Sequence, residues 1–284
     1  MTASRSDGPA LVPLEDVRAK YREKAIERGI NPRDVDLLLS DLLGRPVTWV
    51  YAHGEELVDP APLRALLARR FCGEPLQYVR GHCEFYGREF AVDRRVLIPR
   101  PETEMLVDET LRRAPRGGKV LDLGTGSGCI ALTIERERPD LAVLSVDVSP
   151  GALAVAAANR RRLGSRAWLA ASDLMASLRA PFDVIVSNPP YIPESEYNGL
   201  QKEVLLFEPR LALTPGREGT EIVERILRDA HRCLAPGGVL MIEVGYGQEE
   251  AVRSLAQRER WSVDSFLPDL AGIPRVVVLS AHGE

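Results

Sequence analysis

The chain has 284 residues, of which 45% are hydrophobic and 27% are charged, and its formal net charge at pH 7 is −4. This composition is typical of soluble globular proteins and excludes collagen-like, coiled-coil and intrinsically disordered classes. At roughly 100–200 residues per domain the length predicts two domains. The acidic balance argues against a protein that holds nucleic acid mainly by neutralising phosphates, because such domains tend to be basic.

The four cysteines, Cys72, Cys83, Cys129 and Cys233, form no C-x-x-C pair, and no histidine lies at zinc-ligand spacing. We therefore expect no disulfide framework, no metal site and a reduced, cytoplasmic compartment. The first residues lack an apolar segment, and no run of about 18 apolar residues occurs, so neither a signal peptide nor a membrane span is expected. Residues 1–10 are predicted to be a loose tail.

Residues 11–75 have helical hydrophobic spacing. Three helices are predicted: one from Leu14 to Gly29, one from the Asn31-Pro32 cap to Gly44, and one from Ala61 to Phe71. Because no polar constellation is visible among them, we expect a small bundle. A purely structural role and a partner-docking role fit this pattern equally well.

The pattern changes between residues 76 and 100. Aromatic and β-branched residues surround Gly87 in the stretch from Glu84 to Val92, which is typical of a β-hairpin. We expect this hairpin to link the helical domain to a second domain at 101–284.

In residues 101–284, buried strands alternate with amphipathic helices, which indicates an α/β fold with a mostly parallel sheet. The final connection, from Leu267 to Pro274, is too short for a parallel crossover, so the last strand is predicted to be antiparallel. Seven strands are expected, at 119–123, 142–146, 168–171, 182–187, 239–244, 261–266 and 275–279.

A glycine-rich loop, Gly124-Thr125-Gly126-Ser127-Gly128, follows the first strand and opens a helix, so its backbone N–H groups can approach a ligand. The next strand ends in Asp147, at the spacing expected for a carboxylate that binds ribose hydroxyls. The spacing G-x-G-x-G disfavours a dinucleotide and suits S-adenosylmethionine, whose amino-acid tail the loop can receive. Asp173 and Leu174 follow the third strand; they are expected to contact the adenine, or Asp173 only caps a helix.

The fourth strand runs directly into Asn188-Pro189-Pro190-Tyr191, at the edge where open α/β sheets bind ligands. The prolines stiffen this loop and remove N–H donors, which leaves it rich in acceptors. An –NH₂ group conjugated to a carbonyl or a ring is a poor nucleophile. The Asn188 side-chain oxygen and the Pro189 carbonyl can hold both of its N–H bonds, and Tyr191 can flank the planar group. This pattern predicts methylation of such a nitrogen.

Four motifs occur together and in order, at residues 84–87, 98–104, 188–192 and 207–210. Their combination resembles the HemK-type protein-(glutamine N5) methyltransferases, which modify the glutamine of Gly-Gly-Gln in class I peptide chain release factors. The resemblance covers roughly Phe71 to Leu279. It implies a Rossmann-like methyltransferase sheet, S-adenosylmethionine as the methyl donor and a small N-terminal domain that docks the substrate.

Carried over by position, the cofactor residues of that family fall on Gly124 to Gly128, Asp147, Leu174 and Asn188, and its substrate loop on Asn188 to Tyr191. Arg100 and Glu102 shape the cofactor entrance or only support the hairpin. One departure is the stretch from Thr214 to Gly219, where members of the family often have a Gly-Gly pair before an Asp-Gly. It concerns the shape of a loop rather than the chemistry.

An adenine-N6 DNA methyltransferase uses the same loop, because the adenine amino group poses the same chemical problem. The acidic charge disfavours it, and the only basic run, Arg160-Arg161-Arg162, suits a solvated helix end. A non-catalytic scaffold would be expected to have lost the glycine-rich loop or the Asn188-Pro189-Pro190-Tyr191 loop, and both are intact. We expect a monomer that meets its protein substrate transiently and holds no nucleic acid stably.

Overall fold

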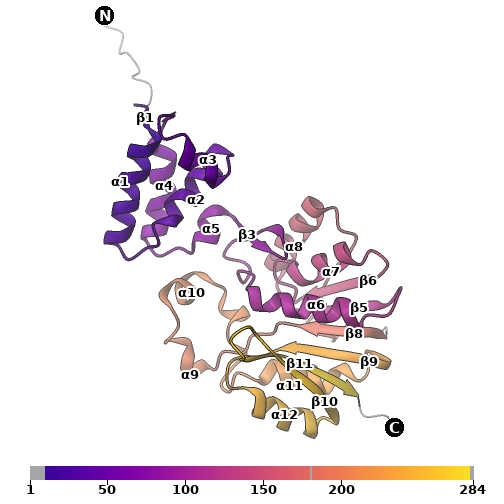
Figure 1. Cartoon of the computed structure of the whole chain (residues 1–284). Coiled ribbons are helices and arrows are strands. Elements are labelled where there is room, and N and C mark those ends of the chain that lie inside the picture. The colour runs from indigo at the N-terminus through magenta and orange to yellow at the C-terminus, as the bar shows by residue number, and fades with distance from the viewer. Residues whose placement is uncertain (1–9, 180, 282–284) are drawn as a thin grey trace, which may run out of the picture. The chain divides into compact units, whose positions relative to one another are not determined.

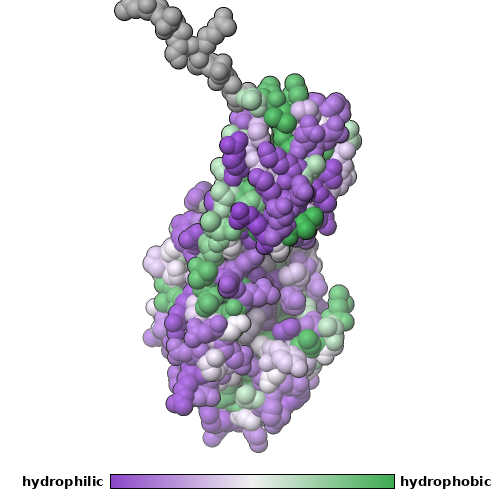
Figure 2. All heavy atoms as spheres, turned by 90° about the vertical axis from the view of Figure 1, so that its left-hand side faces the viewer, coloured by the Kyte–Doolittle hydropathy of each residue, from purple (hydrophilic) through white to green (hydrophobic). Residues whose placement is uncertain are grey.

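The computed structural model describes residues 10–179 and 181–281, so nearly all of the predicted loose tail lies outside the described residues. The chain forms two compact units, one ending at Arg80 and the other beginning at Gly81 (Figure 1). Within the described ranges no helix is long and apolar enough to cross a membrane. Hydrophilic side chains cover most of the face that Figure 2 presents.

The first unit is a helical bundle with one short β-pairing. Its core contains Leu14, Leu38, Leu63 and Leu67, which are at most 1% exposed. The three predicted helices are present, and two others were missed because six or five residues are too short to show a helical period. The elements are β1 (Val12–Pro13), α1 (Leu14–Glu27), α2 (Arg33–Leu43), α3 (Val47–Ala52), β2 (Leu57–Val58), α4 (Pro60–Phe71) and α5 (Leu76–Arg80).

A buried carboxylate joins three of these helices, so the expectation of a bundle without a polar constellation was wrong. Asp36 on α2 is fully buried. Its oxygens accept from Arg18 Nε at 2.8 Å, from Arg22 of α1, and from Tyr51 Oη of α3 at 3.1 Å. These partners lie 14 to 18 residues away in the sequence, so only the packing of the helices shows that they meet.

We expect Asp36→Ala to destabilise the first unit by about 1–3 kcal/mol, because two guanidinium groups and a phenol lose their shared acceptor. Glu23→Ala, on the exposed side of α1, is the matched control and should change stability by less than about 0.5 kcal/mol. Hydrogen exchange of amides in α1 and α2 measures the effect on this unit alone. Equal exchange rates in the two variants would contradict a structural role for Asp36.

The second unit contains a seven-stranded sheet in the order β10-β11-β9-β8-β5-β6-β7. β11 runs antiparallel to both neighbours, and the other pairs are parallel. The predicted α/β class with an antiparallel last strand is therefore confirmed. The strands are β5 (Lys119–Leu123), β6 (Ala142–Asp147), β7 (Trp168–Ala171), β8 (Phe182–Ser187), β9 (Leu234–Glu243), β10 (Trp261–Pro268) and β11 (Pro274–Ala281).

Helices cover both faces of this sheet (Figure 1). Successive residues of β11 show why: Val276 and Val278 enter one hydrophobic cluster with α6 and α7, whereas Val277 and Leu279 enter the other with α11 and α12. Alternation along each buried strand thus builds two cores. The main helices are α6 (Glu104–Arg113), α7 (Cys129–Glu137), α8 (Pro150–Leu163), α11 (Glu221–Ala230) and α12 (Glu249–Arg258).

The hairpin consists of β3 (His82–Phe85) and β4 (Arg88–Ala91) and belongs to the second unit. Phe85 and Phe90 pack edge to face, with ring centroids 6.0 Å apart, in the cluster that also holds α6 and α7. The residues from 76 to 100 therefore do not act as one segment, since α5 stays with the helical unit and the hairpin packs on the sheet.

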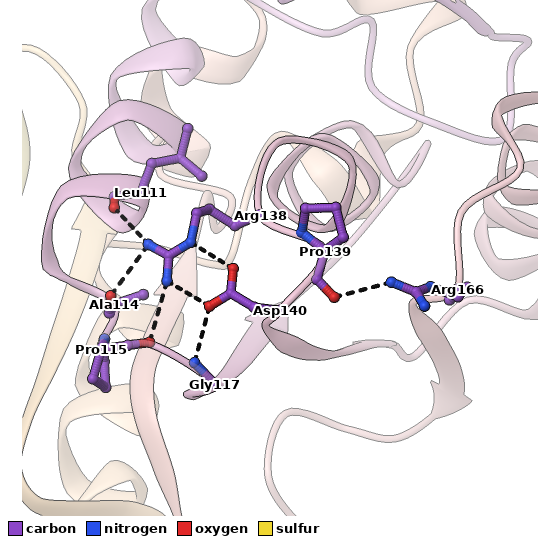
Figure 3. A network of polar contacts seen from close by, with 8 residues as sticks. All are labelled: Leu111, Ala114, Pro115, Gly117, Arg138, Pro139, Asp140 and Arg166. Carbon is purple, nitrogen blue, oxygen red and sulfur yellow. Dashed lines mark hydrogen bonds and ion pairs between the residues drawn. The ribbon is translucent and has the colours of Figure 1, made fainter.

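Arg138 and Asp140 form an ion pair in the connection from α7 to β6 (Figure 3). Arg138 donates to both carboxylate oxygens of Asp140, at 2.7 and 2.8 Å, and to the carbonyls of Leu111, Ala114 and Pro115 at the end of α6. Asp140 also accepts from Gly117 N at 2.9 Å. Arg138 and this N–H hold the pKa of Asp140 well below its usual range. The network joins α6, α7 and β6 at the amino end of the strands.

Candidate active site

A cavity opens at the carboxyl ends of β5, β6, β7 and β8. The sheet register explains the convergence, because Leu123 pairs with Ser187 and so Gly124 and Asn188 leave neighbouring strands at the same level. Ten of the twelve predicted site residues line the cavity, beside the segment from Arg95 to Thr103: Gly124, Thr125, Gly126, Ser127, Asp147, Asp173, Leu174, Asn188, Pro189 and Pro190. Gly128 and Tyr191 lie outside it.

Gly128 packs closely against the helix that follows the loop. Its φ of +85° lies in the left-handed region, and an added Cβ would lie 2.9 Å from Leu132 Cδ1 on α7. Gly128 therefore lets the loop turn tightly into α7. The part of the loop that lines the cavity is the stretch from Gly124 to Ser127.

Asp147 ties the glycine loop to the end of β6. Its carboxylate accepts from Gly126 N at 2.9 Å and from Ser149 N at 2.8 Å. An ionised carboxylate has about four acceptor positions, so capacity remains for two hydroxyl groups of a ligand. These remaining acceptor positions fit the two hydroxyl groups of a ribose.

Buried hydroxyl groups in the cavity wall lack hydrogen-bond partners among the described residues: Thr125 Oγ1, Ser127 Oγ and Ser172 Oγ. Buried polar groups are normally paired, so these three are suited to a polar ligand. Together with Asp147 they fit the adenosine and the amino-acid tail of S-adenosylmethionine.

Asp173 and Leu174 both line the cavity. The Asp173 carboxylate accepts from Arg225 Nη2 of α11 at 2.7 Å, and its side chain is 54% exposed. The Asp173 carbonyl accepts from Ala176 N at 3.1 Å. Leu174 has a φ of +47°, which is uncommon for a residue with a Cβ. The turn thus presents Leu174 at the cavity, while Arg225 engages part of Asp173.

Asn188 lies where two cavities meet, since it lines both the first cavity and a second one. Its Nδ2 donates to Thr103 Oγ1 at 3.0 Å, and Thr103 Oγ1 donates to Glu243 Oε2 at 2.7 Å. The second cavity is lined by Leu97, Arg100, Asn188, Tyr191, Ile192, Leu200, Gln201, Val204, Ala212 and Leu213. A group bound in the second cavity can therefore contact a ligand of the first cavity beside Asn188.

Tyr191 is held from two sides. An added Cβ on Gly245 would lie 2.9 Å from Tyr191 Cδ2, so the ring lies against that backbone. The Tyr191 carbonyl accepts from Gln248 Nε2 at 2.9 Å. Burial, reinforced by the nearby Glu243, raises the pKa of Tyr191 to about 12, so the phenol stays neutral near pH 7.

The sequence reasoning missed Thr103, Glu208 and Glu243. Glu208 is buried and accepts from Arg100 Nη2 at 2.5 Å and from Ile98 N at 3.3 Å. Arg100 lines both cavities. For Glu243 the sequence does hold a signal: it ends an apolar strand, and acidic side chains are rarely buried unless they have a partner. Thr103 and Glu208 lie in the motifs at residues 98–104 and 207–210, but the motifs do not show their partners, which lie 85 to 140 residues away.

Comparisons with known proteins agree with this geometry. The family model "Methyltransferase small domain" matches residues 101–217, and "PrmC N-terminal domain" matches residues 18–81. The chain is 46% identical to the release factor glutamine methyltransferase of Koribacter versatilis, over 85% of this chain and 88% of that protein. It is 42% identical to the protein of the same name from Geobacter sulfurreducens, over 93% and 94%.

Among solved structures, a methyltransferase from Pyrococcus furiosus aligns with a TM-score of 0.54 at 20% identity. The alignment covers 75% of this chain and 96% of that one. At this identity the likeness shows the fold alone.

Asp122 lies on β5 below the glycine loop and is fully buried, and neither carboxylate oxygen has a hydrogen-bond partner among the described residues. Burial raises its pKa from 3.8 to about 7; the adjacent Thr125 side chain opposes the shift, and the charge of Asp147 adds to it. Between these values the folded protein holds a proton that the unfolded chain has released. Stability therefore falls as the pH rises through this window.

We expect Asp122→Asn to remove this contribution. Between about pH 4 and about pH 7, the wild type should lose more unfolding free energy than the variant, because asparagine has no proton to release. Urea unfolding at several pH values measures the difference in slope, and the contribution of every other group cancels in the comparison. Parallel curves would contradict the raised pKa.

Proposed function

The chain belongs to the release factor glutamine methyltransferase family, and we propose that it transfers the methyl group of S-adenosylmethionine to the N5 amide nitrogen of the Gly-Gly-Gln glutamine in class I peptide chain release factors. The observation that carries this proposal is the position of Asn188 at the junction of two cavities. One cavity suits the methyl donor, and the other suits the side chain that receives the methyl group.

The first cavity offers a partner for each part of S-adenosylmethionine, which supplies an electrophilic methyl group on a sulfonium. Asp147 would accept the ribose hydroxyls. The loop from Gly124 to Ser127 would receive the amino-acid tail, with the hydroxyls of Thr125 and Ser127 as further partners. Leu174 would cover the adenine, and Asp173 would accept from its amino group.

The second cavity and the loop after β8 address the weak nucleophilicity of an amide nitrogen. The Asn188 side-chain oxygen and the Pro189 carbonyl would accept both N–H bonds of the glutamine and hold its nitrogen toward the methyl group. As positive charge develops on that nitrogen, fixed acceptor dipoles stabilise it without rearranging. Pro189 and Pro190 keep the loop rigid, and the neutral Tyr191 flanks the planar amide.

The first unit is proposed to dock the release factor, which is consistent with the PrmC N-terminal domain match at residues 18–81. We further propose a monomer in the cytoplasm, where release factors act in translation termination, without stable nucleic-acid binding. Two of the three consecutive arginines are engaged within the second unit, since Arg160 donates to the Ala167 carbonyl and Arg162 pairs with Glu89.

Asn188→Ala is expected to lower single-turnover methylation by on the order of 10² or more while leaving S-adenosylmethionine affinity nearly unchanged, because a preorganised acceptor of the transition state is lost. Asn198→Ala, an exposed position at the end of α9 (Glu194–Tyr197), is the matched control and should react normally. Near-normal rates for Asn188→Ala would refute the catalytic assignment.

The substrate is tested with methyl-tritiated S-adenosylmethionine offered to a purified release factor, to its Gly-Gly-Gln variant with Gln→Ala, and to duplex DNA. We expect label on the unmodified release factor only. Label on DNA would favour an adenine-N6 methyltransferase, and equal label on the Gln→Ala factor would place the methyl group on another residue.

Asp147→Ala is expected to weaken S-adenosylmethionine binding by about tenfold or more, because it removes a charged acceptor for the ribose hydroxyls. Asp173→Ala should have a smaller effect, since Arg225 already engages that carboxylate. Isothermal titration calorimetry of both variants provides the comparison. If Asp173→Ala weakened binding more than Asp147→Ala, the two roles would have to be exchanged.

A further inference from the structure

We propose that Thr103 and Glu243 are positioning residues for methyl transfer: the Glu243 carboxylate, acting through the Thr103 hydroxyl, holds the Asn188 side-chain amide with its oxygen toward the substrate. This inference rests on the proposed function and deepens it. The three residues come from the 3₁₀ turn η1 (Pro101–Thr103), the end of β9 and the loop after β8. Their contacts span 85 and 140 residues of the chain.

The direction of each hydrogen bond follows from the number of protons available. An ionised carboxylate only accepts, so the single proton of the Thr103 hydroxyl points to Glu243 Oε2, 2.7 Å away. Because that proton is used, Thr103 Oγ1 can act toward Asn188 only as an acceptor. The group of Asn188 that faces it is therefore the donor Nδ2, at 3.0 Å. The Asn188 oxygen is thereby turned away from Thr103 and is free to accept from the substrate.

Burial makes this chain of bonds strong. Thr103 and Glu243 are 1% and 2% exposed, so water does not compete for either group. In such surroundings successive hydrogen bonds polarise one another. The negative charge of Glu243 therefore draws the Asn188 N–H toward Thr103 and makes the Asn188 oxygen a better acceptor for a nitrogen that becomes positive.

A proton on Glu243 would reverse the chain. A carboxylic acid can donate to Thr103 Oγ1, whose own proton could then reach the Asn188 oxygen and turn the amide round. The amide nitrogen would face the substrate, where two donors would oppose each other. The ionisation of Glu243 thus selects the productive orientation of Asn188.

The charged and titratable groups facing Glu243 are Glu102 on η1, Tyr191 after β8 and Arg275 on β11. Burial raises the pKa of Glu243 to about 7; Glu102 adds to the shift, whereas the Thr103 hydrogen bond, Arg275 and the nearby Asn188 side chain oppose it. Methyl transfer should therefore decline as the pH falls through about 7.

The first test compares Thr103→Val, which keeps the shape of the side chain but removes the hydroxyl, with Thr103→Ser, which restores it. For Thr103→Val we expect kcat to fall by about 10- to 100-fold, with KM for the release factor and affinity for S-adenosylmethionine nearly unchanged. Thr103→Ser should recover most of the activity. Thr110→Val is the matched control, because its buried hydroxyl donates to the Leu106 carbonyl within α6.

The second test is the pH profile of kcat, which a purely structural role would not move. The wild type and Thr103→Ser should lose activity as the pH falls through about 7. Glu243→Gln should be slower at high pH and should lack this acid limb, because its side chain does not titrate.

Three results would overturn the inference. The first is a Thr103→Val enzyme with wild-type kcat, and the second is one that loses cofactor affinity in parallel with kcat. The third is an acid limb that persists in Glu243→Gln, which also decides the matter if Thr103→Val fails to fold. A wild type that does not methylate a release factor refutes the proposed function itself, and this inference falls with it.

Discussion

The parallel pairing of β5 with β6 on one side and β8 on the other is the constraint on which the site depends. It aligns Leu123 with Ser187 and, through β6 and β7, Asp147 with Ala171. The residues that follow these strand ends must then share one edge of the sheet. Because the chain leaves β5 toward β6 and later returns on the other side as β8, the loops separate there and leave a crevice for a ligand.

The segment from Ile98 to Glu104 contacts the hairpin, Glu208, Glu243 and Asn188, which strand pairing alone does not bring together. Glu104 accepts from Tyr86 N at 2.7 Å and so fixes the turn of the hairpin. Arg100 pairs with Glu208, and Thr103 joins Asn188 to Glu243. Pro99 and Pro101 restrict the backbone between these contacts. The sequence left open whether this segment supports the hairpin or shapes the entrance of the cofactor cavity. The structure shows that the same stiff segment supports the hairpin and lines the cavity.

Two buried carboxylates beneath the site lower the stability of the fold when they are ionised. Asp122 and Glu243 each have a pKa raised to about 7 by burial, and neither is neutralised by a direct ion pair among the described residues. Such groups oppose folding when ionised. Their placement at the ends of central strands, beside the glycine loop and Asn188, is typical of a site where local stability yields to electrostatic preorganisation.

Local patterns in the sequence determined the strands, the main helices, the glycine loop and the loop from Asn188 to Tyr191, because alternation, helical spacing and the backbone limits of glycine and proline act over a few residues. Tertiary structure alone decided the partners of Asp36, Arg100, Thr103 and Glu243. Each of these contacts joins residues 14 to 140 positions apart, and its existence depends on sheet order, register and helix packing. A side chain carries its chemistry in the sequence, but the distance to its partner arises only when the chain folds.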